Sequence, residues 1–119
     1  MSKATIRWIK IFENREAIEN CIPPKRTWKI TADRKEICLV NSGTDFYAVD
    51  DKCPHQGASL SHGYCSEMNS IVCPLHRYHF DLKTGRPISG LCDRILTYPL
   101  KFEDTGVYLG IEDKSWSWW

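Results

Sequence analysis

Two short loops in the middle of the chain, Cys53-Pro54-His55-Gln56-Gly57 and Cys73-Pro74-Leu75-His76, decide how the rest of the sequence is interpreted. Each loop opens with Cys-Pro and contributes one histidine. Two thiolates and two imidazoles are the soft and borderline ligands that iron and zinc prefer. The stretch from Cys53 to His76 therefore predicts a metal site, which either iron or zinc could occupy.

The size and charge of the chain limit what can surround this site. A chain of 119 residues has enough surface to bury for one compact domain, so residues 1–119 are expected to form a single domain. The sequence contains 16 Lys and Arg against 15 Asp and Glu, without long runs of one sign. This balance gives no electrostatic footprint for nucleic acid or for an anionic membrane, and it favours a protein partner.

The segment Met1–Arg7 lacks the apolar core of a secretion signal, and no stretch is apolar for long enough to span a membrane. We therefore expect a cytoplasmic protein. In that reducing compartment, the six cysteines are better explained by metal binding and buried thiols than by disulfides. The four cysteines outside the two loops share no ligand spacing and are expected to be inert thiols. They are Cys21, Cys38, Cys65 and Cys92.

Short apolar segments separated by turn residues run through the whole chain and predict an all-β fold, either a small antiparallel sandwich or a barrel. The segment 14–20 could form a single helical turn, but it is short and is followed by Pro23 and Pro24, so it is expected to be a connecting loop. The expected strands are residues 5–12, 27–31, 36–40, 46–50, 70–72, 78–82, 96–102 and 107–111.

The pairing of Cys-x-His with Cys-x2-His, with proline after both cysteines, resembles the Rieske iron-sulfur family. Gly57-Ala58-Ser59-Leu60, Gly63 and Phe80-Asp81-Leu82-Lys83-Thr84-Gly85 extend the similarity. The resemblance is strong over about residues 50–87, and it implies a cluster-binding subdomain of two loops inserted into the β domain. The flanking strands match only as a small β domain.

The resemblance implies a Rieske 2Fe-2S cluster with a divided ligand set. In this family each loop gives its cysteine to one iron and its histidine to the other. Cys53 and Cys73 are therefore expected to bind the inner iron, and His55 and His76 the outer iron. Neutral imidazoles in place of two thiolates make the oxidised cluster less negative, which raises its reduction potential above that of clusters with four thiolates.

Features that raise the potential further in respiratory members of the family are missing here. Those members have a disulfide between positions equivalent to Ala58 and Leu75, and hydroxyl donors at positions equivalent to Tyr78 and Phe80. We therefore predict a potential near the low end of the Rieske range of about −150 to +300 mV. A measured midpoint above about +100 mV at neutral pH would contradict this prediction.

Other residues near the loops have plainer interpretations. His62 and His79 are expected to be structural or exposed, because the four ligand positions are already filled. Lys52 and Arg77 are expected to be ordinary surface residues, although they could also steer an acidic partner. The tryptophans at 116, 118 and 119 are expected to pack back on the β domain, with partner docking as the alternative.

The resemblance implies an electron carrier without enzymatic activity of its own. No nucleotide-binding glycine motif is present, and no space is left for a mononuclear iron oxygenase domain. The chain is expected to be a monomeric ferredoxin that accepts electrons from a flavin-dependent reductase and passes them to a terminal oxygenase. The alternatives are a small subunit of a nitrite-type assimilatory reductase and a zinc-stabilised interaction module, which would be colourless.

Overall fold

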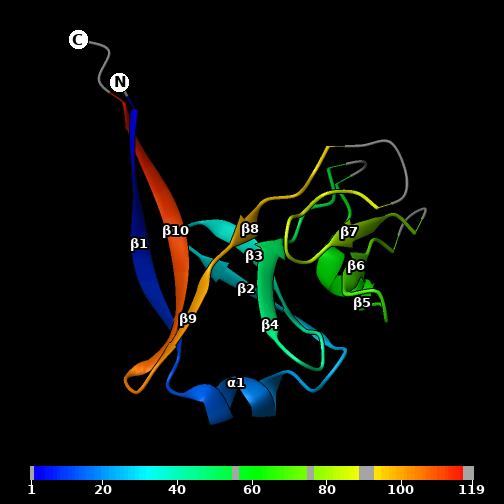
Figure 1. Ribbon diagram of the computed structural model, residues 1–119, viewed down its shortest axis with the longest axis horizontal. Helices are drawn as coiled ribbons and strands as arrows, with labels where there is room; N and C mark the ends of the chain where they lie inside the picture. The colour runs from blue at the N-terminus through cyan, green and yellow to red at the C-terminus, as the bar shows by residue number, and fades with distance from the viewer. Residues whose placement is uncertain (1, 55–56, 75–76, 89–92, 117–119) are drawn as a thin grey trace.

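The computed structural model describes residues 2–54, 57–74, 77–88 and 93–116, and it describes side chains only between residues 5 and 112. These residues form three antiparallel sheets (Figure 1), so the predicted all-β class is confirmed. The first sheet has the order β1 (Ser2–Phe12), β10 (Gly106–Trp116) and β9 (Leu100–Glu103). The second has the order β2 (Thr27–Ala32), β3 (Lys35–Asn41), β4 (Phe46–Asp50) and β8 (Thr97–Tyr98). The third has the order β5 (Tyr64–Cys65), β6 (Ser70–Val72) and β7 (His79–Asp81).

The third sheet is inserted between two neighbouring strands of the second. β4 and β8 pair directly, with Ala48 opposite Tyr98, yet β5, β6 and β7 all lie between them in the sequence. The inserted residues form the part of the molecule at the right of Figure 1. The topology therefore separates a β body from a smaller unit that contains both Cys-Pro loops.

The prediction of a loop at residues 14–20 is wrong, because Arg15–Cys21 forms the helix α1. Asn14 caps this helix, since its side-chain oxygen accepts a hydrogen bond from the Ala17 N–H at 2.8 Å. Ile18 is fully buried and packs in the core of the body. A helix of two turns is marginal on its own, so this tertiary contact and the cap explain why the segment is helical.

Several strand boundaries differ from prediction. Pro99 divides the predicted strand 96–102 into β8 and β9, because proline has no N–H to donate to a sheet. The Pro99 carbonyl instead accepts a hydrogen bond from the Gly110 N–H at 2.9 Å. The polar segment between the ligand loops, where no strand was predicted, contains β5 and overlaps the short 3-10 helix η1 (Leu60–His62).

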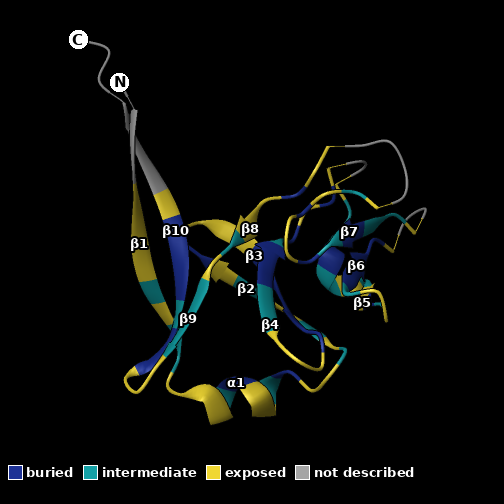
Figure 2. Cartoon of the chain, in the orientation of Figure 1, coloured by how far each residue is buried: buried dark blue, intermediate teal, exposed yellow. Residues whose placement is uncertain are grey.

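Buried side chains form two cores, one on each side of β3 (Figure 2). Successive side chains of a strand point to opposite faces, so Ile37 and Leu39 enter one core while Cys38 and Val40 enter the other. The body core consists of Ile18, Ile22, Ala32, Ile37, Leu39, Ala48, Val107, Leu109 and Ile111. The loop core consists of Cys38, Val40, Val49, Cys53, Leu60, Cys65, Ile71, Cys73, Phe80, Leu82 and Ile95.

β1 and β10 continue past the body as a two-stranded ribbon (Figure 1). β9 covers only Gly106–Leu109 of β10, whereas the pairing with β1 extends to Ser2 opposite Trp116. Both strands are longer than predicted. The Trp116 side chain, Trp118 and Trp119 lie outside the described residues, so the packing of the tryptophans stays a prediction. The described part of the chain also contains no helix with the length and apolar content needed to span a bilayer.

Candidate metal centre

Both candidate cysteine ligands lie at the ends of strands and inside one core. Cys53 follows β4, and Cys73 directly follows β6. Each is 1% exposed, and both belong to the loop core. β4 of the second sheet and β6 of the insert therefore bring two thiols that are far apart in the sequence into the same buried cluster. His55 and His76, the other two predicted ligands, lie outside the described residues.

The first ligand loop is fixed by backbone hydrogen bonds around Cys53. The Cys53 N–H donates to the Ala58 carbonyl at 2.8 Å, and the Gly57 N–H donates to the Cys53 carbonyl at 2.7 Å. Gly57 has a φ of 74°, a left-handed conformation that a residue without Cβ adopts at low cost. The glycine therefore permits the tight return that leads the chain from Cys53 back to Ala58.

The second ligand loop has a comparable arrangement without glycine. The Cys73 N–H donates to the Tyr78 carbonyl at 2.8 Å, which closes the loop over residues 73–78. Arg77 adopts a φ of 53°, an uncommon conformation for a residue that has a Cβ. Both loops thus hold their cysteine through a backbone hydrogen bond to the residue that ends the loop.

Asp51 anchors the first loop, and sequence reasoning did not identify it. Its side chain is almost fully buried and accepts hydrogen bonds from the Ser59 hydroxyl at 2.5 Å and from the Ser61 N–H at 2.8 Å. The Lys29 ammonium lies 3.8 Å from the same carboxylate. A buried carboxylate needs such donors, so Asp51 ties both ends of the loop to the β body. Its position directly after a predicted strand was the only signal in the sequence.

A second polar network supports the other loop through β6 and β7. Ser70 is fully buried, and its hydroxyl lies 3.1 Å from Nδ1 of His79 and 2.5 Å from the Ser66 hydroxyl. His79 is therefore a structural residue, as predicted. His62 is exposed in η1.

The remaining described cysteines show no feature of metal ligands. Cys38 is fully buried in β3, and burial raises the pKa of its thiol, with smaller contributions from the charges of Asp51 and Cys65. Burial also raises the pKa of Cys65. The thiolate is the form that binds metal, so the raised pKa of both thiols agrees with the prediction that they are inert. Cys21 is partly buried in α1, and Cys92 lies outside the described residues.

Around the predicted ligand loops, the described residues fit a cluster with cysteine and histidine ligands. The site offers two buried thiols on loops with fixed backbones, and each loop carries a histidine two or three residues after its cysteine. Phe80 is fully buried in the same core, and half-buried Tyr78 packs against it. An apolar shell of this kind limits access of water, which helps to set the redox potential of an enclosed metal centre.

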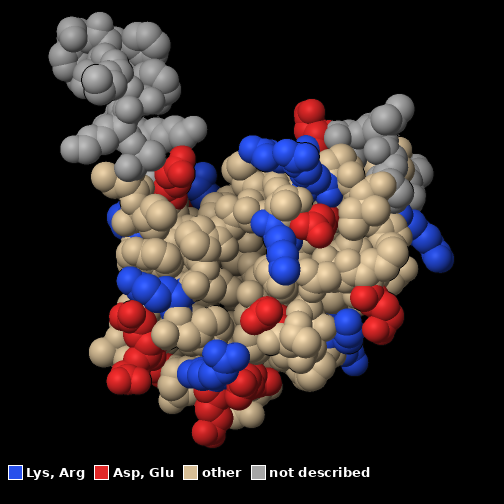
Figure 3. Space-filling model, viewed as in Figure 1, with Lys and Arg blue, Asp and Glu red and all other residues tan. Residues whose placement is uncertain are grey.

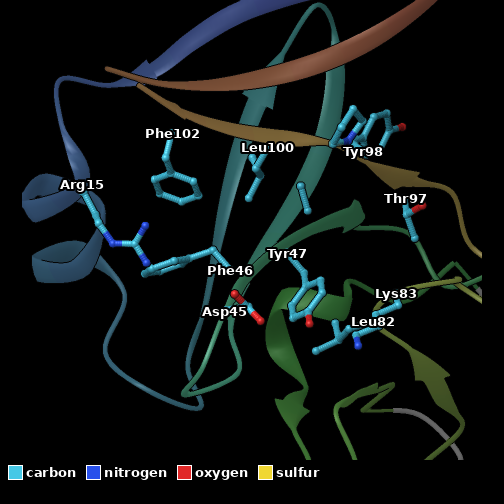
Figure 4. A pocket seen from close by; sticks show the side chains of 12 residues that line it. Arg15, Asp45, Phe46, Tyr47, Leu82, Lys83, Thr97, Tyr98, Leu100 and Phe102 are labelled. Carbon is cyan, nitrogen blue, oxygen red and sulfur yellow. The ribbon is translucent and has the colours of Figure 1, made fainter. Parts of the chain in front are cut away.

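The structure also contains a pocket of about 560 Å³ on the side of β4 and β9 (Figure 4). Its walls combine aromatic, aliphatic and charged side chains. The Phe46 and Phe102 ring centroids are 5.9 Å apart, and the Arg15 guanidinium lies 4.6 Å from the Phe102 centroid. Leu82 and Lys83 of the insert form the opposite wall. Neither of the two described predicted ligands, Cys53 and Cys73, is among the described residues that line this pocket.

Comparison with known proteins identifies the class to which this fold and site belong. Residues 8–99 match the Rieske [2Fe-2S] domain family. The chain belongs to this family, and its cofactor is a Rieske-type 2Fe-2S cluster. When bound, this cluster supplies one-electron oxidation and reduction.

Individual relatives of known function are ferredoxins of dioxygenase systems. The 3-phenylpropionate/cinnamic acid dioxygenase ferredoxin subunit of Shigella boydii serotype 4 (strain Sb227) is 38% identical over 81 residues, which cover 65% of this chain and 74% of that protein. The solved ferredoxin of carbazole 1,9a-dioxygenase from Nocardioides aromaticivorans IC177 is 28% identical, with a TM-score of 0.70 over 76% of this chain and 88% of that chain. A solved complex of reduced oxygenase and oxidized ferredoxin in carbazole 1,9a-dioxygenase gives 26% identity and a TM-score of 0.71, over 86% and 91% of the chains.

Proposed function

We propose that this chain is a one-electron carrier that passes electrons from a flavin-dependent reductase to a terminal oxygenase. The observation that carries the proposal is the burial of Cys53 and Cys73 in one core, on loops with fixed backbones, in a member of the Rieske family. The carrier is the ferredoxin component of a larger oxidoreductase system and has no enzymatic activity of its own. Its relatives, which are named as dioxygenase ferredoxins, support this role over that of a nitrite reductase subunit.

In this proposal Cys53 and Cys73 bind the inner iron, and His55 and His76 bind the outer iron. The cysteines have the burial that the inner position requires. The remaining residues hold the loops, because Asp51 fixes the first loop and Ser70 with His79 supports the second. The chain's own contribution to electron transfer is therefore to keep four ligands in place before and after the electron arrives.

The acceptor and the molecular organisation form part of the same proposal. A ferredoxin with 26% identity is described in complex with its oxygenase, which supports an oxygenase as the acceptor here. We further propose that residues 1–119 act as one domain and that residues 50–87 are its cluster-binding subdomain. The carrier works as a cytoplasmic monomer that meets its donor and acceptor in turn.

The ligand assignment is tested by replacing single cysteines in the reconstituted holoprotein. Cys53→Ser and Cys73→Ser are each expected to abolish the visible absorption of the cluster and to lower the iron and sulfide content, because serine offers no thiolate. Cys65→Ser is the matched control, since Cys65 is a buried thiol of the same core. Full cluster content in either ligand variant would contradict the assignment, as would equal losses in all three variants.

The carrier role is tested by affinity capture from an extract of the source cells, with the holoprotein as bait. Recovery of a flavin-dependent reductase and an oxygenase is expected, followed by NADH-dependent reduction of the bait by the captured reductase. Capture of a large reductase chain of the sulfite or nitrite type, in equal amount, would overturn the proposal. So would a colourless protein that contains zinc after reconstitution with iron and sulfide.

A further inference from the structure

Four exposed basic residues lie on adjoining segments at the end of the molecule that carries the ligand loops. Lys52 precedes Cys53, and Arg77 lies inside the second loop. Arg86 and Arg94 lie between β7 and β8 in the sequence. Backbone hydrogen bonds connect the start of this stretch to β7 and its end to β4. The Arg86 carbonyl accepts from the Asp81 N–H at 2.8 Å, and the Leu96 carbonyl accepts from the Asp50 N–H at 3.0 Å. We call Lys52, Arg77, Arg86 and Arg94 the basic group.

The charge of this end is not balanced locally. Residues 52–60, 73–80 and 86–95 contain the four members of the basic group and one acidic residue, Asp93, which gives +4 − 1 = +3. The whole chain has a formal charge of +1, so the rest carries +1 − 3 = −2. Asp51 does not offset the excess at the surface, because its carboxylate is buried against Ser59, Ser61 and Lys29.

The basic group makes no ion pair within the described part of the chain. The ion pairs there involve basic residues elsewhere, namely Arg7, Lys10, Arg15, Lys25 and Lys29. Figure 3 shows basic side chains beside the loops drawn in grey, with acidic side chains among them, and both signs are also mixed at the opposite end of this face. The charges near the ligand loops are thus left available to a partner.

An exposed apolar side chain accompanies these charges. Ile88 is 50% exposed, and its N–H donates to the His79 carbonyl at 2.7 Å, which places it beside the strand that leaves the second loop. The Lys52 stem runs along the first loop, since its Cε lies 3.3 Å from the position that a Cβ on Gly57 would occupy. An apolar contact with polar surroundings is the usual composition of a docking surface between proteins.

We propose that the basic group and Ile88 form a docking face for carboxylate-rich surfaces of the redox partners. This inference rests on the proposed function as an electron carrier and adds the chemistry by which partners are recognised. Complementary charge raises the rate of encounter and orients the two proteins, while its attraction is screened by salt. The face would thus direct the ligand loops toward an acidic patch beside the partner's own redox group.

The inference can be tested without an identified partner, by using two cobalt complexes of opposite charge. One electron leaves the reduced holoprotein and converts Co(III) to Co(II), either in the cobalt(III)–EDTA monoanion or in the hexaamminecobalt(III) trication. The reduced protein has a formal charge of zero, from +1 for the chain and −1 for the added electron. The overall charge therefore predicts that the oxidation rate does not depend on salt concentration. Any salt dependence of the rate reports the local charge near the ligand loops, where the electron leaves.

For the native protein, we expect the rate with the anion to fall about tenfold as sodium chloride rises from low to high concentration, and the rate with the cation to rise. Lys52→Gln/Arg94→Gln is expected to remove most of both trends. Arg7→Gln/Lys10→Gln is the matched control, because it removes the same charges from exposed ion pairs on β1. The control should keep the native trends. Poly-L-glutamate should slow the reaction with the anion, and poly-L-lysine should not.

The outcomes separate the docking inference from the carrier function. If both oxidants react but the native rates do not depend on salt, or if the two double variants behave alike, the docking inference is wrong and the carrier function stands. If the reconstituted protein transfers no electron to either oxidant, the carrier function itself fails. Visible spectra and midpoint potentials of both variants must match those of the native protein for the comparison to count.

Discussion

At the scale of single residues, Phe80 is a position that bears on the redox potential. It is fully buried in the core that contains Cys53 and Cys73. The resemblance to respiratory Rieske proteins implies that a tyrosine at this position donates a hydrogen bond to the cluster. The phenylalanine of this chain offers an apolar ring instead, so the reduced state lacks that stabilisation.

Phe80→Tyr is therefore expected to raise the midpoint potential. A hydrogen bond that favours the reduced state by about 1 kcal/mol corresponds to about 40 mV for a one-electron couple. The measurement is redox titration of the holoprotein followed by visible absorption. Phe102→Tyr makes the same chemical change in a half-buried ring that packs against the body core, and it should leave the potential unchanged. An unchanged or lower potential in Phe80→Tyr with an intact spectrum would contradict the argument.

Asp51 is the residue on which the position of the first loop depends. Asp51→Asn keeps the shape but replaces one accepting oxygen by a donor that faces the Ser59 hydroxyl or the Ser61 N–H. Loss of a buried hydrogen bond costs about 1–3 kcal/mol, and we expect this decrease in the free energy of unfolding. Urea denaturation of the holoprotein measures it.

Asp33→Asn provides the control for this change, because Asp33 pairs with Arg7 at the surface and both side chains are partly exposed. An exposed pair contributes about 0–1 kcal/mol. If the two variants lose the same stability, Asp51 does not have the anchoring role that its contacts indicate. Faster loss of the cluster in Asp51→Asn alone would support that role further.

At the scale of elements, the contact between β4 and β8 is short and is reinforced by one side-chain pair. The two strands share two residue pairs, and the Tyr98 hydroxyl donates to the Asp50 carboxylate at 2.5 Å. Burial, the hydrogen bond to Asp50 and the charge of Asp50 raise the pKa of Tyr98. The folded state therefore holds the phenolic proton more tightly than the unfolded state does.

The sign of the resulting pH dependence follows from proton linkage. The stabilising contribution of Tyr98 is present below the ordinary tyrosine pKa of about 10 and is lost as the pH rises above it. We expect the free energy of unfolding to decrease with pH in this range, and Tyr98→Phe to reduce the slope by at most one proton per molecule. The raised pKa of Cys38 contributes to the slope with the same sign in the native protein and in Tyr98→Phe. The difference between the two slopes therefore reports Tyr98. Equal slopes would contradict this prediction.

Elements whose residues follow a two-residue period or a turn signal could be predicted from the sequence. β4 and β6 were predicted with the bounds that the structure has, because strand-forming residues and clear turn residues delimit them. α1 was missed since its helical state depends on the cap at Asn14 and on the burial of Ile18, and the latter is a tertiary contact. The division of one predicted strand at Pro99 was foreseeable from the missing N–H alone.

Some residues of the metal site could likewise be predicted from the sequence, and others could not. The two cysteines could be identified because the Cys-Pro loops have a fixed spacing, and their common burial agrees with a role as ligands. Asp51 could not be identified, since a lone carboxylate after a strand has no pattern that distinguishes it from a surface residue. Its role depends on Ser59 and Ser61, which reach it only after the first loop has folded back.

For the molecule as a whole, the separation into two cores predicts that loss of the cluster destabilises the insert more than the β body. Among the described residues, the loop core contains both predicted cysteine ligands and the body core contains neither. Stability need not be uniform across a structure, and regions with few remaining contacts open first. The insert should therefore loosen in the protein without cluster while the body stays folded.

Hydrogen exchange measured by mass spectrometry can test this division, with Cys53→Ser as the form without cluster. Peptides from residues 57–74 and 77–88 are expected to exchange much faster than in the native holoprotein. Peptides from β2, β3 and β10 should retain their protection. Uniform loss of protection over both regions would indicate a single cooperative unit and would contradict the prediction.

The ribbon of β1 and β10 gives the molecule a natural point of attachment. Because Ser2 pairs with Trp116, both ends of the described chain emerge together, on the opposite side of the body from the inserted loops (Figure 1). A tether fixed to either end would hold the protein with its ligand loops directed away from the support. Immobilised on an electrode in this orientation, the protein would exchange electrons with dissolved partners more readily than with the electrode surface.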